Sequence, residues 1–479
     1  MVPLVSVSSG GKRYTARVGT AFIRAQTAWR RHSSVCSAAL IAAISFTLHL
    51  IPFVFYSANP LGYDTGFYRR YLIEPLLSFP SAPVPGLGAD ALLPRIVLDA
   101  LHFLQISPDI ALYGSYIVFS SLLPVLFFFW LKPFLGARGA IIGGLLLAVS
   151  PVGYTAYWYM LYKNAFALCL LLLAFILYER RLFWPLVALD IGIAFSHKTS
   201  AIIYLLTLCV LAIVDYRRLK EILVHAALVA ACFALIFFNT PVVSLILKGG
   251  AVAIFLDWKE YIVFSVPLFI GALGAIAAWK RIVVPRSLIA FALASFAFPV
   301  LTLPFYQRIF VFTDIALAAF AAYGINFFIS RLTFDTASRS TYFFFTLLCI
   351  IGGLQLGNLQ AQVRQLRPLE ASAHLNQIAA IGALVPPDAL LLTTNREAPW
   401  YQGWTRSHIA APGMLYDTHD LEAWTTFWSS TSTPERIAFL NTFSRPLYIS
   451  TLGDFSHLIG EPLPCLTSVA PKLLRNDCS

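Results

Sequence analysis

The sequence predicts an all-α polytopic membrane protein, with about eleven transmembrane helices and a small α/β domain outside the membrane. The 479 residues are 58% hydrophobic and only 12% charged, with a mean hydropathy of +0.74. A soluble domain is about half apolar and about a quarter charged. From about residue 358 the long apolar runs give way to short ones, which indicates a separate C-terminal domain.

The apolar runs have the length that membrane-spanning helices need, which is about 20 residues each. We expect helices near 36–56, 112–131, 139–157, 164–178, 182–196, 199–214, 222–240, 260–279, 287–304, 309–329 and 341–357. This divides the chain into a basic N-terminal segment (1–35), a transmembrane module (36–357) and an exported α/β domain (358–479). The first run is too long for the apolar region of a cleaved signal peptide, so we expect it to remain as an anchor.

The positive charges predict the orientation. With residue 1 in the cytoplasm, 18 of the 34 Lys and Arg residues lie on the cytoplasmic side, as the positive-inside rule requires. An odd number of helices then exports the C-terminal domain. The net charge of +11 is therefore explained by topology, and we expect no nucleic acid partner.

The cysteines indicate no metal-binding pair. Five of them lie in or beside apolar helices, where they pack as small hydrophobic residues: Cys36, Cys169, Cys209, Cys232 and Cys349. Cys465 and Cys478 lie in the exported domain, where a disulfide could form.

A polar loop at 57–111 follows the first helix, and it begins with Asp64 between Gly62 and Gly66. Residues 67–77 and 93–104 have apolar side chains at helical spacing, separated by a Pro/Gly segment. We expect two short helices in the membrane interface; the alternative is an ordinary packed loop. Asp64 is the predicted reaction centre at the membrane surface, and the alternative is a solvated acid that caps a helix. Its neighbours are aromatic, basic and acidic candidates for substrate binding: Tyr63, Tyr68, Arg69, Arg70 and Glu74.

Charged side chains at membrane depth are the next clue, because each is costly there. The predicted topology brings four basic residues to the face that carries Asp64: Lys163, His197, Lys198 and Arg308. Together they could hold a lipid-linked phosphate through charge-assisted hydrogen bonds; singly, each could be a residue that snorkels to the interface. Asp190 and Asp314 are expected inside the membrane, either paired with a neighbouring cation or engaged in proton coupling.

The C-terminal domain has short apolar runs at 389–394, 446–451 and 466–469, which suit strands, while 370–384 and 433–443 suit helices. Trp400, Trp404 and Arg406 could stack on sugar rings and bind anions. The alternative is a Trp-rich core followed by a turn.

This layout resembles the GT-C superfamily of membrane glycosyltransferases, which includes protein O-mannosyltransferases, aminoarabinose transferases and oligosaccharyltransferases. The resemblance is carried by the order of the segments, by the Pro-rich segment of the first loop and by four short motifs: Gly62–Phe67, Tyr162–Asn164, Ser196–Thr199 and Pro304–Arg308. It implies a polyprenyl-phosphate sugar donor and a lipid, glycan or protein acceptor. It also implies that Asp64 acts as general base, that the anomeric carbon is inverted, and that basic residues stabilise the departing phosphate.

The resemblance is incomplete in one respect. Some relatives have adjacent acids, or an Asp followed by a spaced His, where this chain has a single Asp64 with Tyr68 four residues later. A divalent cation such as Mg²⁺ or Mn²⁺ is therefore left open as a cofactor. We expect an integral protein of a bacterial inner or plasma membrane.

Two other functions are compatible with a protein that has many membrane-spanning helices. A transporter or lipid flippase would use Asp190 and Asp314, but such proteins usually have two related halves with broken helices, and the sequence contains no visible repeat. The second alternative function is that of a non-catalytic membrane scaffold with a sugar-binding domain. The sequence contains no Gly-rich phosphate loop between a strand and a helix, so no nucleotide-sugar site is expected.

Overall fold

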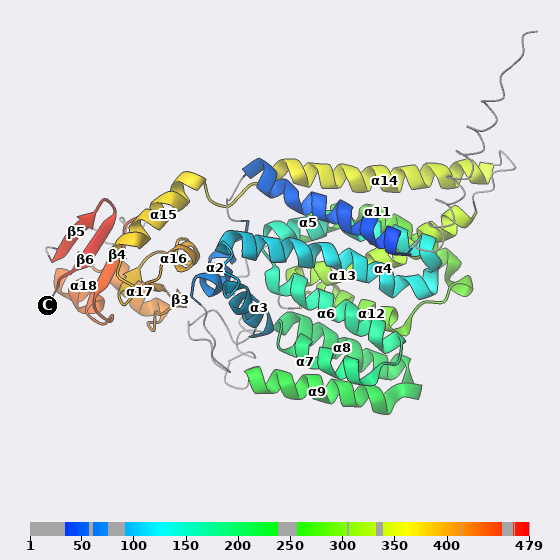
Figure 1. Ribbon diagram of the computed structural model, residues 1–479, viewed down its shortest axis with the longest axis horizontal. Helices are drawn as coiled ribbons and strands as arrows, with labels where there is room; N and C mark the ends of the chain where they lie inside the picture. The colour runs from blue at the N-terminus through cyan, green and yellow to red at the C-terminus, as the bar shows by residue number, and fades with distance from the viewer. Residues whose placement is uncertain are drawn as a thin grey trace, which may run out of the picture.

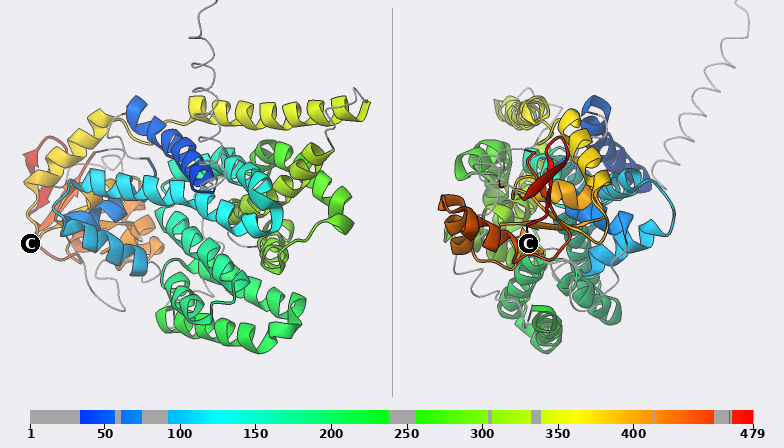
Figure 2. Two further views of the ribbon diagram at one scale, coloured as in Figure 1. Left: turned by 45° about the vertical axis from the view of Figure 1, so that its right-hand side comes forward. Right: turned by 90° about the vertical axis from the view of Figure 1, so that its left-hand side faces the viewer.

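The computed structural model describes residues 34–56, 61–74, 92–237, 256–303, 306–331, 339–412, 414–452, 463 and 465–478. Long helices form a bundle, and the C-terminal α/β domain lies at one end of it, beside the first-loop helices (Figures 1 and 2). The predicted fold class is confirmed. Cys465 and Cys478 form a disulfide, with their Cα atoms 4.8 Å apart.

Six described helices are long and apolar enough to cross a membrane: Ser34–Tyr56, α4 (Pro108–Ala148), α6 (Tyr162–Glu179), Tyr216–Ile236 around α9 (Leu219–Phe237), α11 (Trp258–Ala278) and α13 (Tyr306–Ser330). Shorter apolar helices complete the bundle: α7 (Phe183–Ala194), α8 (Lys198–Val214) and α12 (Arg286–Val300). The long helix α14 (Arg339–Gln365) leads to the C-terminal domain (Figure 1).

Some helix boundaries differ from those expected. Segments 112–131 and 139–157 are joined in α4, with a kink at Gly136, whose φ of 66° suits glycine. The second segment then ends at Ala148, because Pro151 starts the new helix α5 (Pro151–Trp158) and Ser150 caps it. Helix α14 continues past the expected boundary at 358 to Gln365.

The centre of the bundle is α13, which packs closely against α11. Gly324 of α13 faces Gly271 of α11, and a Cβ on Gly324 would lie 1.8 Å from the Gly271 carbonyl oxygen. Small residues let membrane helices approach until their backbones touch. Ala321 of α13 lies against the same Gly271, whereas the next residue, Ala322, lies against Gly143 of α4.

The C-terminal domain has a six-stranded mixed sheet in the order β3-β2-β1-β4-β6-β5. Its strands are β1 (Leu390–Leu392), β2 (His408–Ala411), β3 (Met414–Leu415), β4 (Leu447–Ser450), β5 (Leu466–Ala470) and β6 (Leu473–Asn476). Its helices are α15 (Ser372–Leu384), α16 (Ala398–Trp404), α17 (Leu421–Ser429) and α18 (Thr433–Leu440).

Alternation along β1 divides the apolar residues between two cores. Leu390 and Leu392 pack in one core with Trp424 of α17, whereas Leu391 faces the other core with Trp400 of α16. Successive side chains of a strand point to opposite faces, so the sheet separates α15 and α16 from α17 and α18. The core that contains Leu391 and Trp400, called the second core below, also includes residues of the first loop such as Tyr68. This shared core joins the domain to the bundle.

Candidate active site at the first loop

The first loop forms two helices, α2 (Thr65–Ile73) and α3 (Leu92–His102), close to the predicted positions. Six of the nine residues of α2 are buried. Helix α2 therefore follows the alternative expectation of a packed loop rather than that of a helix lying in the membrane interface. It lies between the helical bundle and the C-terminal domain (Figure 1).

Asp64 occupies the N-cap position of α2, yet its side chain makes no capping hydrogen bond. Helix capping thus does not explain this carboxylate, which is partly exposed. The amide of Thr65 donates to the Gly62 carbonyl over 3.1 Å and closes the turn that carries Asp64. A Cβ on Gly62 would lie 2.3 Å from the Tyr159 carbonyl oxygen, so only glycine lets this turn lie directly on the corner between α5 and α6.

The predicted basic residues lie at three helix corners. Lys163 is in the first turn of α6, which begins at the corner beneath the Asp64 turn. His197 and Lys198 begin α8, and the amide of Leu93 in α3 donates to the Phe195 carbonyl beside them over 2.9 Å. The first loop therefore contacts two of the three corners.

The third corner carries Arg308, which lies in the first turn of α13. Tyr306, in the same turn, stacks on Trp258 at the start of α11, with ring centroids 6.2 Å apart. His197 differs from the other basic residues because it is buried, and its Nδ1 lies 3.1 Å from Ser200 Oγ.

Arg69 and Arg70 join α2 to the C-terminal domain. Arg69 donates to both carboxylate oxygens of Asp109 and, over 2.5 Å, to the carbonyl of Gly403. Its guanidinium also lies 4.6 Å from the centre of the Trp404 ring.

Arg70 donates to the carbonyl of Thr405 over 2.6 Å, to that of Arg406 over 3.0 Å and to the carboxylate of Glu74 over 2.8 Å. The arginine side chains are thus engaged in domain contacts, whereas the side chain of Arg406 is exposed.

Tyr63 connects the Asp64 turn with the domain. Its hydroxyl donates a short hydrogen bond to the carbonyl of Asn395. Burial, assisted by the negative charges of Asp64 and Glu397, raises the pKa of Tyr63 to about 12, so the hydroxyl stays a neutral donor. The neighbouring Trp400 is only 1% exposed and belongs to the second core, which matches the expected alternative of a Trp-rich core.

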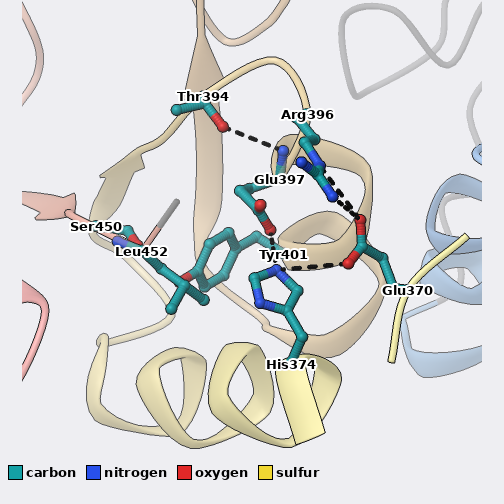
Figure 3. A network of polar contacts seen from close by, with 8 residues as sticks. All are labelled: Glu370, His374, Thr394, Arg396, Glu397, Tyr401, Ser450 and Leu452. Atoms are coloured by element: carbon teal, nitrogen blue, oxygen red, sulfur yellow. Dashed lines mark hydrogen bonds and ion pairs between the residues drawn. The ribbon is translucent and has the colours of Figure 1, made fainter. Parts of the chain in front are cut away.

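A polar network surrounds Arg396 and Glu397, the residues that follow Asn395, and it was not expected from the sequence (Figure 3). His374 of α15 donates from Nε2 to the buried Glu397 over 2.7 Å, and Arg396 donates to Glu370 over 3.2 Å. Tyr401 bonds Ser450 of β4 over 2.7 Å. Because these residues are spread over 80 positions and belong to no known motif, no sequence signal links them.

The two acids within the bundle are paired with polar groups. Asp190 accepts from the hydroxyl of Tyr204 over 2.8 Å and lies 2.5 Å from His225 Nδ1. Asp314 accepts from the hydroxyl of Ser150 over 2.7 Å and lines a cavity of about 60 Å³. That volume holds a few water molecules but no sugar. Asn164 lines this cavity, whereas Asp64 and the predicted basic residues do not.

Among the residues that the structure describes, no group of three or more His, Cys, Asp or Glu side chains is placed to hold a metal ion.

No protein-family model and no curated protein sequence matches the chain. Solved structures do match its fold. The oligosaccharyltransferase of Archaeoglobus fulgidus in the apo form is similar with a TM-score of 0.62 and 10% identity, over 88% of this chain and 70% of that chain. The same enzyme tethered with an acceptor peptide containing the NVT sequon has a TM-score of 0.61 and 11% identity, over 88% and 69% of the two chains.

ArnT from Cupriavidus metallidurans, bound to undecaprenyl phosphate, has a TM-score of 0.55 and 14% identity, over 93% of this chain and 98% of that chain. These identities establish the fold alone. The resemblance drawn from the sequence is confirmed at that level: the chain has the fold of the GT-C membrane glycosyltransferases.

Proposed function

We propose that this protein is a glycosyltransferase that moves a sugar from a polyprenyl-phosphate donor to an acceptor on the exported face of the membrane. The shared fold supports this proposal, because one similar structure contains undecaprenyl phosphate and another an acceptor peptide. The observation that carries it is the position of the first loop. Its two helices place the turn with Asp64 on the α5–α6 corner and contact the corner with Lys198.

In the proposed reaction, an acceptor hydroxyl or amine attacks the anomeric carbon of the donor sugar. Asp64 takes the acceptor proton as general base. The bond between the anomeric carbon and the phosphate oxygen breaks as the new bond forms, which inverts the anomeric configuration. The polyprenyl phosphate leaves, and its negative charge is stabilised by Lys163, Lys198 and Arg308.

A divalent cation would add positive charge beside the departing phosphate. The Archaeoglobus oligosaccharyltransferase was also crystallised with zinc and sulfate. The described residues of this chain offer only Asp64 as an acid in the first-loop turn, so we derive no step through a metal. Adding a chelator to the transfer assay measures whether a cation is needed.

The exported orientation follows from the charge asymmetry of the sequence. It places the reaction on the outer face of a bacterial inner or plasma membrane, with the N-terminus in the cytoplasm. Lipids, glycans and proteins all remain candidate acceptors.

The test of the base is Asp64→Asn, which keeps the shape of the side chain and removes its negative charge. Transfer of sugar should fall about 100-fold to 10,000-fold, while donor binding stays close to wild type. The matched control is Glu74→Gln, because Glu74 is half exposed on the same helix and pairs with Arg70. An active Asp64→Asn with an inactive Glu74→Gln would move the base to Glu74, and two fully active variants would end the case for a first-loop acid.

A further inference from the structure

A polar contact attaches the turn that carries Asp64 to the C-terminal domain. The hydroxyl of Tyr63, the residue just before Asp64, donates to the carbonyl of Asn395, 332 positions away in the sequence. Tyr63 remains a neutral donor because its pKa is raised to about 12. The hydrogen bond to Asn395 therefore restrains the turn that carries Asp64. Contacts that set the position of Asn395 also restrain the position of Asp64.

Asn395 lies in a turn that leads from β1 into α16. Within it, the Glu397 amide donates to Thr394 Oγ1 over 3.3 Å, and the Ala398 amide donates to the Thr394 carbonyl over 2.9 Å. These bonds set the direction of the Asn395 carbonyl, since a turn closed on both sides leaves the peptide between them little freedom.

The 394–397 turn is itself anchored by Glu397, whose side chain is only 2% exposed. Its carboxylate accepts from His374 Nε2 over 2.7 Å (Figure 3). Glu370, just before the start of α15, adds an ion pair to Arg396 over 3.2 Å. Helix α15 and the residue Glu370 just before it thus bind Arg396 and Glu397, the two residues that directly follow Asn395.

The backbone of α16 is also in contact with α2. A Cβ on Gly403 would lie 2.5 Å from the Gly66 Cα atom, so the two helices cross at van der Waals distance. A shift of the 394–397 turn is therefore transmitted to the N-terminal end of α2 by two routes, through Tyr63 and through this crossing.

We infer that Glu397 and His374 are positioning residues for Asp64, and that they act through Asn395 and Tyr63. This inference deepens the proposed function and depends on it for the catalytic role of Asp64. The docking of the Asp64 turn onto the C-terminal domain does not depend on that catalytic role, and it is measured independently of sugar transfer.

The first measurement is amide hydrogen exchange on the full-length protein in detergent. Tyr63→Phe removes only the hydroxyl, and Glu397→Ala removes the anchor. Each should speed exchange of the amides at 61–68 about 3- to 10-fold, the effect of losing one hydrogen bond. Exchange in β1 and β4 should stay at the wild-type rate, because these strands keep their own pairing.

The second measurement is sugar transfer. Tyr63→Phe and Glu397→Ala should lower kcat about 3- to 10-fold with KM for the donor unchanged, since positioning affects the reacting group more than donor binding. Glu397→Gln should restore most of kcat, because the amide oxygen still accepts from His374. Arg475→Ala, which breaks an exposed ion pair with Asp477 in the same domain, serves as the matched control and should match wild type in both measurements.

Unchanged exchange at 61–68 in both Tyr63→Phe and Glu397→Ala would overturn the inference. A Glu397→Gln variant as inactive as Glu397→Ala would also overturn it, since that result requires the carboxylate charge itself. If the wild-type protein transfers no sugar from any lipid-linked donor, the proposed function fails. The exchange measurement would still decide whether Glu397 holds the Asp64 turn.

Discussion

Substituting Gly66 tests the contact that joins the first loop to the C-terminal domain. A Cβ at this position would lie 1.6 Å from the Pro399 carbonyl oxygen and 2.6 Å from the Pro399 carbonyl carbon. Both neighbours are backbone atoms of α16, so no side-chain rotation can relieve the clash. Gly66→Ala must therefore separate α2 from α16.

The size of the effect follows from these distances. Real Cβ contacts essentially never fall below 3.0 Å, so the Pro399 oxygen must retreat from 1.6 Å to at least that value. Overpacking of this kind costs about 1–3 kcal/mol, which exceeds the roughly 1 kcal/mol that Ala gains over Gly in a helix. The same separation stretches the hydrogen bonds from Arg69 to Gly403 and from Arg70 to Thr405.

Two assays measure the result: thermal unfolding of the purified protein in detergent, and sugar transfer with a lipid-linked donor. We expect a lower melting temperature and a loss in turnover of about 100-fold, the typical effect of displacing a reacting group by about 1 Å. The matched control is Gly353→Ala in α14, where an added Cβ meets no atom within 4 Å. This control should keep wild-type turnover and melt at the wild-type temperature or slightly above it.

Wild-type stability and turnover in Gly66→Ala would refute the reasoning. That result would mean that α2 and α16 are not in contact in the functional protein, and that Asp64 does not depend on the C-terminal domain.

Three further outcomes are expected. Arg308→Ala should lower turnover about 100-fold while the protein folds normally, and wild-type turnover in this variant would assign Arg308 to the membrane interface. Burial raises the pKa of Glu397 above 4.5, so the folded domain keeps a proton that the unfolded chain has released. The unfolding free energy should therefore fall as pH rises from 4.5 through this raised pKa; thermal melts of Glu397→Gln over the same range should show a flatter slope. Cys478→Ser opens a loop with a sequence separation of 13 and should lower the unfolding free energy of the C-terminal domain by about 3 kcal/mol relative to the oxidised wild type, as measured by denaturant unfolding without reductant; the reduced wild type should unfold like the variant.

The fold class and the order of the parts can be predicted from the amino-acid sequence alone. Long apolar runs must form helices, because lipid offers no hydrogen-bond partners to the backbone. The strands at 390–392 and 447–450 lie within the expected runs, since short apolar segments bounded by polar residues are typical of strands. These features depend on neighbours along the chain, which a sequence displays directly.

Helix breaks were harder to predict. The end of α4 at Ala148 and the new helix at Pro151 depend on one capping bond from Ser150. That bond interrupts an apolar run whose hydropathy does not change. Hydropathy measures only the preference for lipid, so it does not report where a helix stops within the membrane.

The partners of the candidate site residues become visible only in the folded protein. From the sequence, Arg69 and Arg70 are candidates for binding phosphate, yet in the fold they contact Asp109 and the carbonyls that end α16. Neither the hydrogen bond from Tyr63 to Asn395 nor the close contact between Gly66 and Gly403 can be predicted from the sequence. Such contacts join residues more than 300 positions apart, and they follow from how two separately folded parts dock, which local periodicity does not encode.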